Sequence, residues 1–296
     1  MRSTGRVADG SAGWDIARPT RPNRAGGIRM AGFRSLATDP IEQRVIAHPS
    51  ITLIFEFGEG ALLIEEATGR QHVGSLAAGL AHGQVRMRGQ HIACVEVRMS
   101  PVVAHAVLGP CPAVLPLDAL SGRDAAQLRE RLSEATSWDE RFAAAEAFLA
   151  ARITAGPPMD PEVIWAWERI TSSGGRIRVD NLAAELGWSR KRLWTRFRSQ
   201  VGLPPKRAAK LVRFDRAVHQ LIAGRSVALI AAECGYVDQS HLYREVLAFS
   251  GTTPTALAGM PGLAENHRAY AGGTTSGVAA TLGAMGERGD DALPRR

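Results

Sequence analysis

Two stretches of this 296-residue sequence, 48 residues apart, follow the same pattern of residue types. Residues 182–197 read LAAELGWSRKRLWTRF, and residues 230–246 read IAAECGYVDQSHLYREV. In each stretch, small apolar residues are followed by a glycine and an aromatic residue, then by polar residues and a second apolar period. This order predicts a short helix, a glycine corner and a second helix, which is the layout of a helix-turn-helix unit.

Each repeated position meets a physical requirement of that layout. Gly187 and Gly235 can adopt the positive φ that a tight corner between two helices commonly needs. Ser189 and Asp238 can cap the helix that follows, because their side-chain oxygens can accept backbone N–H groups. Apolar residues four positions apart are expected to hold each second helix to its core: Leu193 with Phe197, and Leu242 with Val246.

Positive charge is concentrated around the first repeat. Lys and Arg number 36 in the whole chain against 29 Asp and Glu, a net charge of +7. Residues 189–216 alone contain ten basic residues and one acid, Asp215, and so carry +9. Such a segment suits contact with DNA phosphates, whereas the alternative is a solvated face on two ordinary helical hairpins. The candidates for phosphate contacts are Arg190, Arg192, Arg196, Arg198, Lys206 and Arg207.

Residues 160–259 resemble the C-terminal DNA-binding domain of the AraC/XylS family of bacterial transcription regulators. The resemblance rests on the two repeats, on the stretch KRAAKLVRFDRAVHQLIAG between them, and on the closing Gly-Thr-Thr-Pro at residues 251–254. It implies an all-α domain in which one long helix joins two helix-turn-helix units that face the same side of double-stranded DNA. The base-reading positions that it implies are Lys191, Trp194, Thr195, Gln239, Ser240, Tyr243 and Arg244.

The sequence departs from the family pattern at two places. The family usually has Arg two residues after the leucine of the first reading helix, where this sequence has Thr195. The second reading helix usually continues into Phe-Lys-Arg or a similar triplet, where this sequence reads Val-Leu-Ala-Phe at residues 246–249. We therefore expect one phosphate contact to be missing at the second unit, and base preference at the first unit cannot be copied from relatives.

The rest of the chain divides into segments of different character. Residues 1–155 are expected to form an α+β sensor and dimerisation domain, with a small β-barrel or sheet over 45–108 and helices over 122–153. Residues 1–32 are expected to be loose apart from 14–19. Residues 156–161, rich in proline, are expected to be a linker to the DNA-binding domain at 160–259. Residues 260–296, rich in Ala, Gly and Thr, are expected to be a disordered tail.

Two stretches in the N-terminal half, residues 99–109 and 117–135, resemble the sensor domains of one branch of the same family. This weaker resemblance implies binding of a small effector or dimerisation, without naming a ligand. Ser137 and Glu140 form a capping-box pattern before the apolar helix face of Trp138, Phe142, Ala145 and Leu149. That face is expected either to dock to a second copy of the chain or to close the core of the β-rich part.

Other classes of site find little support in the sequence. The three cysteines (Cys94, Cys111, Cys234) are too far apart for a metal site or a disulfide framework, and Cys234 is expected to be a core residue. The five histidines between His48 and His105 have no spacing that assigns metal ligands. No apolar run is long enough to cross a membrane, and no signal peptide is recognisable, which favours a cytoplasmic location. No cofactor is implied.

The sequence favours a non-enzymatic, sequence-specific transcription regulator that responds to a small effector. Its expected partners are double-stranded DNA, the effector, a second copy of the chain and, if it is an activator, RNA polymerase. One alternative is a nucleoid or adaptor protein that binds DNA without strong sequence preference. Another is a DNA-repair enzyme with the same helical module, but that class needs a cysteine cluster for zinc and alkyl transfer.

Overall fold

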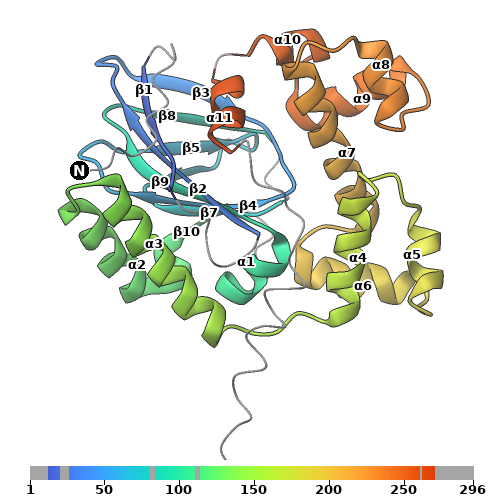
Figure 1. Ribbon diagram of the computed structural model, residues 1–296, viewed down its shortest axis with the longest axis horizontal. Coiled ribbons are helices and arrows are strands. Elements are labelled where there is room, and N and C mark those ends of the chain that lie inside the picture. Colours follow the sequence, from blue (N-terminus) through green and yellow to red (C-terminus); the bar gives the residue numbers. More distant parts are fainter. Residues whose placement is uncertain (1–12, 21–26, 81–83, 111–113, 261, 271–296) are drawn as a thin grey trace, which may run out of the picture.

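The computed structural model describes residues 13–20, 27–80, 84–110, 114–260 and 262–270. The N-terminal half contains two β-sheets with helices on one side, and the C-terminal half is helical (Figure 1). This is the expected combination of an α+β part and an all-α part. None of the described helices is both long enough and apolar enough to cross a membrane.

All strand pairings between the described strands are antiparallel, and the strands belong to two separate sheets rather than to one closed barrel. The first sheet has the order β1 (Trp14–Ala17), β2 (Ile28–Ser35), β9 (Ala93–Met99), β4 (Ile51–Glu56), β7 (Leu76–Ala78), β10 (Val114–Pro116). The second has the order β3 (Ile41–Val45), β8 (Val85–Gly89), β5 (Leu63–Glu66), β6 (Gln71–Val73).

The strands extend beyond the expected range of 45–108 at both ends, from β1 to β10, and a helix interrupts them. Strands begin at Trp14 rather than at residue 45; β1 falls in the stretch 14–19 that was expected to be ordered, but the expectation of a loose start is wrong for the part of β2 before residue 33. The Gly- and Arg-rich residues around them hid the short apolar alternation of these strands. Residues 101–108, expected within the β-rich part, form helix α1 (Pro101–Leu108), with Pro101 in its first turn and Ser100 as its cap.

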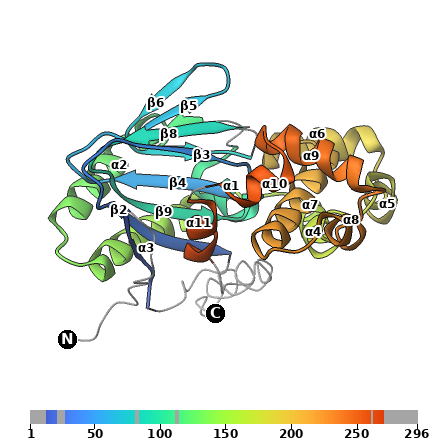
Figure 2. The ribbon, with the colours of Figure 1, turned by 90° about the horizontal axis from the view of Figure 1, so that it is seen from above.

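Central strand β4 shows how the first sheet is covered on both faces. All six of its residues are buried, as expected for a β-branched and aromatic run inside a two-sided sheet. Leu53 and Phe55 belong to the apolar cluster shared with the helices, whereas Ile54 belongs to the cluster between the two sheets. Helices α2 (Leu117–Glu134) and α3 (Trp138–Ala155) cover the helical side (Figures 1 and 2).

The apolar face of α3 packs inside the protein's own core. The capping box predicted for Ser137 and Glu140 is confirmed, with both reciprocal contacts present. Phe142 and Leu149 are 3% and 1% exposed, and the Trp138 ring packs so closely on β2 that Gly32 has no room for a Cβ. The interpretation of this face as a docking site for a second copy is therefore wrong, because the first sheet already covers it.

The C-terminal half is built around helix α7 (Pro205–Ile222), whose buried residues contact helices on both sides of it. The other helices are α4 (Pro161–Ser172), α5 (Val179–Glu185), α6 (Arg190–Val201), α8 (Val227–Glu233), α9 (Gln239–Ser250) and α10 (Pro254–Ala258). Cys234 is fully buried beside α8, which confirms its expected role as a small core residue.

The connection between the two halves is packed rather than extended into solvent. It runs from the end of α3 at Ala155 to the start of α4 at Pro161, and Met159 within it is 6% exposed. The Asp160 N–H donates to Oε1 of Gln200 on α6 at 2.8 Å. The two halves therefore touch along this connection, where α1 also lies against α6.

The expectation of disorder from residue 260 is wrong for the first part of the tail. Residues 263–269 form helix α11 (Leu263–Ala269), which returns to the N-terminal half (Figure 2). Ala269 and Tyr270 are 4% and 6% exposed and join the apolar cluster between the two sheets. This burial stabilises a helix whose own sequence is too short to form one in isolation. The remainder of the expected tail, residues 271–296, lies outside the described residues.

Candidate DNA-binding surface

Both helix-turn-helix units have the corners and caps that the repeat predicted. Gly187 has φ of 63° and Gly235 has φ of 78°. The Arg192 N–H donates to the Ser189 side chain at 3.2 Å, and the His241 N–H donates to Oδ1 of Asp238 at 2.6 Å. Helices α6 and α9 therefore begin at fixed points relative to the helices before them.

The predicted core pairs hold α6 and α9 to the domain by one face. Leu193, Phe197, Leu242 and Val246 are each 0% exposed. Because these residues recur every four positions, the remaining positions of α6 and α9 point away from the core. All seven base-reading candidates are exposed, and the two largest, Trp194 and Tyr243, are 45% and 39% exposed. Exposed apolar and polar side chains early in a helix suit contact with base edges in a major groove.

The basic residues of α6 differ in what they contact. The guanidinium of Arg192 lies 4.4 Å from the centre of the Trp188 ring, and that of Arg198 lies 4.9 Å from the centre of the Trp194 ring. Arg190 pairs with Asp180 at 3.0 Å and Arg196 pairs with Asp160 at 2.7 Å. Arg190 and Arg196 would have to leave or share these carboxylates to contact a phosphate. The side chains of Lys206 and Arg207, in the first turn of α7, are exposed.

The two reading helices occupy comparable places on α7. In Figure 1, α6 lies near one end of α7 and α9 near the other. In Figure 2, α6 and α9 lie on the same side of the helical half. Two helices arranged in this way can enter the major groove at successive helical turns on the same side of the duplex.

The N-terminal half comes close to the first reading helix. Pro110, just after α1, lines a shallow groove together with Trp194, Thr195 and Arg198. The base-reading face of α6 is therefore bordered by the N-terminal half, a contact that could not be predicted from the sequence.

Residues 182–259 match a protein-family profile described as "Helix-turn-helix domain", and the match extends from α5 to α10. It therefore covers both repeats and the helix that joins them. The C-terminal domain is an AraC-type helix-turn-helix domain.

The comparison with solved structures returned AraC-type proteins at low identity. ToxT from Vibrio cholerae is 13% identical, with 80% of this chain and 99% of that chain covered and a TM-score of 0.49. The C-terminal domain of AraT, a response regulator from Geobacillus stearothermophilus, is 18% identical, with 34% and 87% covered and a TM-score of 0.33. The AraC-like transcriptional activator CuxR is 15% identical, with 77% and 90% covered and a TM-score of 0.31. No curated protein sequence matches.

The two departures from the AraC-type pattern both lie on the surface. Thr195 is exposed on α6, in the position where the family usually has Arg. Leu247, which is 53% exposed on α9, follows Val246 in the stretch where the family usually places a lysine. An apolar side chain cannot bind a phosphate, so Leu247 cannot make the phosphate contact that a lysine could make from this part of the AraC-type domain.

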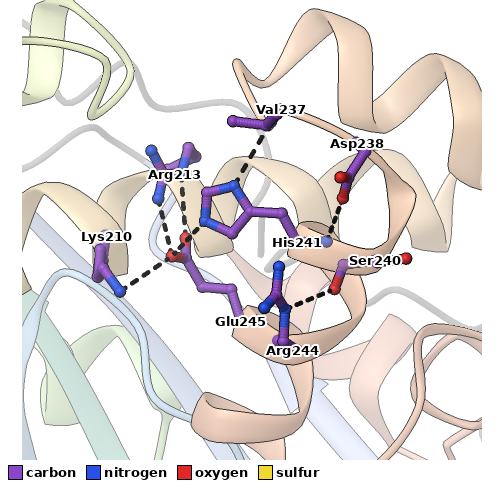
Figure 3. Close-up of polar contacts among 8 residues, drawn as sticks. All are labelled: Lys210, Arg213, Val237, Asp238, Ser240, His241, Arg244 and Glu245. Atoms are coloured by element: carbon purple, nitrogen blue, oxygen red, sulfur yellow. Dashed lines mark hydrogen bonds and ion pairs between the residues drawn. The ribbon is translucent and has the colours of Figure 1, made fainter.

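Sequence reasoning missed a buried ionic cluster beneath the second reading helix (Figure 3). The Glu245 side chain is 3% exposed, and Arg213 of α7 donates to both of its oxygens, at 3.0 and 2.7 Å. Lys210 and His241 lie 3.6 and 3.8 Å from the same carboxylate. Arg213 also lies over the ring of Tyr236, and burial raises the pKa of that phenol.

This cluster ties the orientation of α9 to α7 in the AraC-type domain. Glu245 is on the core side of α9, between the buried Leu242 and Val246. An acid in that position needs a partner, because an isolated buried carboxylate is strongly unfavourable. The spacing of Glu245 from Leu242 was a readable signal of burial, but its partner lies 32 residues away and could not be identified from the sequence.

Proposed function

We propose that the protein is a sequence-specific DNA-binding transcription regulator whose N-terminal half responds to a small effector. The observation that supports DNA reading best is the pair of helix-turn-helix units, each with an exposed polar face, at the two ends of α7. In the proposed roles, Lys191, Trp194 and Thr195 read bases from α6. Gln239, Ser240, Tyr243 and Arg244 read bases from α9.

The proposed phosphate contacts come mainly from the first unit and from the start of α7. Arg192, Arg198, Lys206 and Arg207 have exposed side chains there, while Arg190 and Arg196 would exchange Asp180 and Asp160 for phosphate. Such exchange is reasonable at exposed ion pairs, which contribute little stability in water. The proposed partner of this surface is double-stranded DNA.

The proposed effector site is a cavity of about 1260 Å³ that extends from between the two sheets of the N-terminal half to α4, α7 and α11. Apolar side chains such as Phe33, Ile54 and Leu76 line it, and Val212 and Val218 of α7 also face it. Pockets of several hundred Å³ with apolar walls and a few polar groups are typical binding sites for small molecules. Because α7 supports both reading helices, a ligand in this cavity would contact the element that positions them.

Selection of bound duplexes from a random pool, followed by footprinting, tests the proposed function. The full chain is expected to enrich a defined site made of two short elements about one helical turn apart. A double variant, Gln239→Ala with Arg244→Ala, is expected to lose enrichment of one element and to keep the other. Enrichment of no defined sequence would contradict the proposal and favour a nucleoid-type DNA-binding protein.

A further inference from the structure

The first segment after the DNA-binding domain lies at the effector cavity proposed above. Asn266, His267, Ala269 and Tyr270, from α11 and its end, are among the residues that line the cavity. Tyr270 belongs to the apolar cluster between the sheets, which also includes Phe33 and Ile54, and its hydroxyl donates to the Glu96 carbonyl at 3.4 Å. The helix therefore occupies space that would otherwise open from the apolar interior toward solvent.

Three arginines of the first sheet hold the carboxyl-terminal end of α11. Arg18, just after β1, donates to the Arg268 carbonyl, and Arg29 of β2 donates to the Tyr270 carbonyl at 3.2 Å. Arg98 of β9 donates to Oδ1 of Asn266 at 2.6 Å, and its guanidinium lies 4.0 Å from the centre of the Tyr270 ring. The last carbonyls of a helix have no partner within the helix and carry partial negative charge. The carbonyl groups at the end of α11 thus accept hydrogen bonds from these arginines, as an anionic group would.

The arginines are only partly balanced by carboxylates, although Asp215 of α7 lies near enough to attract both Arg29 and Arg98. Arg98 pairs with Glu96 at 2.8 Å, but no carboxylate in the described parts of the chain forms an ion pair with Arg29. Burial, and then repulsion from Arg98, lower the pKa of the Arg29 guanidinium, and the attraction of Asp215 offsets only part of this effect. Arg29 is a half-buried cation beside an apolar cavity, and its hydrogen-bond acceptor is a neutral carbonyl. An anionic group of a ligand would bind this guanidinium more strongly than the carbonyl does.

The same helix also contacts the DNA-binding domain. The rings of His267 on α11 and His219 on α7 meet edge to face, with their centres 4.0 Å apart. His219 in turn lies 3.6 Å from the Asp215 carboxylate, which also faces the cavity. Movement of α11 would therefore remove one of the contacts that hold α7 against the N-terminal half.

We propose that α11 and Tyr270 form an internal lid, which an apolar ligand with one anionic group displaces by binding Arg29 and Arg98. The apolar walls select the body of the ligand, and the two guanidinium groups select its charged end. The proposal rests on the effector response proposed above and specifies both the ligand class and the moving element. A neutral apolar ligand would fill the cavity without competing for the arginines, so the lid would stay closed.

Two fluorescent probes of similar shape separate these cases in the full-length protein. The first, 8-anilinonaphthalene-1-sulfonate, is apolar and anionic, and the second, N-phenyl-1-naphthylamine, is its neutral counterpart. The variants are Tyr270→Ala, which removes the part of the lid inside the cavity, and Arg29→Met, which removes the guanidinium that forms no ion pair within the described parts of the chain. Tyr243→Ala makes the same change as the lid variant at a tyrosine outside the cavity and is the matched control.

We expect the anionic probe to bind the wild-type protein saturably and to bind Tyr270→Ala about tenfold more tightly, the scale of one lost competing contact. Arg29→Met should weaken the anionic probe by a similar factor and leave the neutral probe unchanged. Saturating anionic probe should also speed chymotrypsin cleavage after Tyr270, while the neutral probe should not. Circular dichroism of each variant checks that it is folded.

The proposal is overturned if Tyr270→Ala binds the anionic probe no more tightly than the wild-type protein and Tyr243→Ala do. It is also overturned if Arg29→Met weakens both probes equally, since the cavity would then select no charge. Affinity for the selected DNA, measured on the wild-type protein, Tyr270→Ala and Arg29→Met, distinguishes failure of the lid proposal from failure of the proposed function. Loss of defined DNA sites would contradict the regulator, whereas failure of the probe experiments with intact DNA binding would contradict only the lid.

Discussion

Glu245 shows how one buried residue can set the direction of a surface that reads DNA. Its carboxylate faces inward from α9 and is held by both nitrogens of the Arg213 fork, with Lys210 and His241 nearby (Figure 3). A buried ion pair of this kind adds little net stability, because desolvation of the two groups offsets their attraction. Its two directed hydrogen bonds instead fix the rotation of α9 about its own axis.

The cluster predicts an asymmetric response to substitution. Glu245→Ala leaves Arg213 buried without its carboxylate and should lower the free energy of unfolding by roughly 3 kcal/mol. The double variant Arg213→Met with Glu245→Leu should recover most of this loss, because apolar side chains of similar size replace both charges. Urea denaturation measures both effects. A loss below about 1 kcal/mol for Glu245→Ala would show that water or Lys210 already screens the pair.

His267 predicts a dependence of lid docking on pH. Burial, followed by the positive charges of His219, Arg98 and Arg29, lowers the pKa of His267 to about 4. An unfolded histidine titrates near pH 6.5, so the open lid binds a proton that the docked lid excludes. The histidine's contribution to docking is therefore complete above about pH 6.5 and is lost progressively as the pH falls toward 4.

The nearby Asp215 responds in the opposite sense, because burial raises the pKa of its carboxyl group and docking then weakens as the pH rises. Comparison with His267→Asn separates the two groups. Between pH 7 and 5, chymotrypsin cleavage after Tyr270, normalised to a peptide substrate at each pH, should accelerate more in the wild-type protein than in the variant. Equal acceleration in both proteins would exclude His267 as the source.

At the scale of elements, the sequence was informative where structure depends on neighbouring residues. The corners at Gly187 and Gly235 and the caps at Ser189 and Asp238 follow from local chemistry, and the structure confirms all four. Helix α11 was missed because its seven residues are stabilised by contacts with α7 and with strands more than 160 positions earlier. For the same reason, periodicity showed that α3 has a buried face but could not show that the first sheet covers it.

The cap of α9 gives a prediction at this scale. Asp238→Ala should lower the free energy of unfolding by about 1 kcal/mol, because the His241 N–H loses its acceptor. Asp238→Asn retains an acceptor oxygen and should change stability much less. Urea denaturation of the two variants measures the difference. Equal losses would indicate that the negative charge of Asp238, rather than its capping hydrogen bond, supports the start of α9.

Across the whole molecule, positive charge and candidate base readers are distributed unequally between the two units. Residues 189–216 contain ten basic residues and one acid, whereas residues 237–254 contain Arg244 against Asp238 and Glu245. Leu247 adds an exposed apolar side chain to α9. The first unit and α7 should therefore supply most of the affinity for any DNA, and the second unit should mainly distinguish sequences.

Salt-dependent titrations on the selected site and on scrambled DNA test this division of labour. Lys206→Ala and Arg192→Ala should weaken binding to both DNAs alike and flatten the slope of log K against log salt by about 0.9 for each lost phosphate contact. Arg244→Ala should instead reduce discrimination between the two DNAs by roughly 1–3 kcal/mol, the value of one good base contact. Both kinds of variant keep the buried cores of α6 and α9, so folding is not at issue. The division fails if Arg244→Ala lowers both affinities equally, or if Arg192→Ala leaves binding to scrambled DNA unchanged.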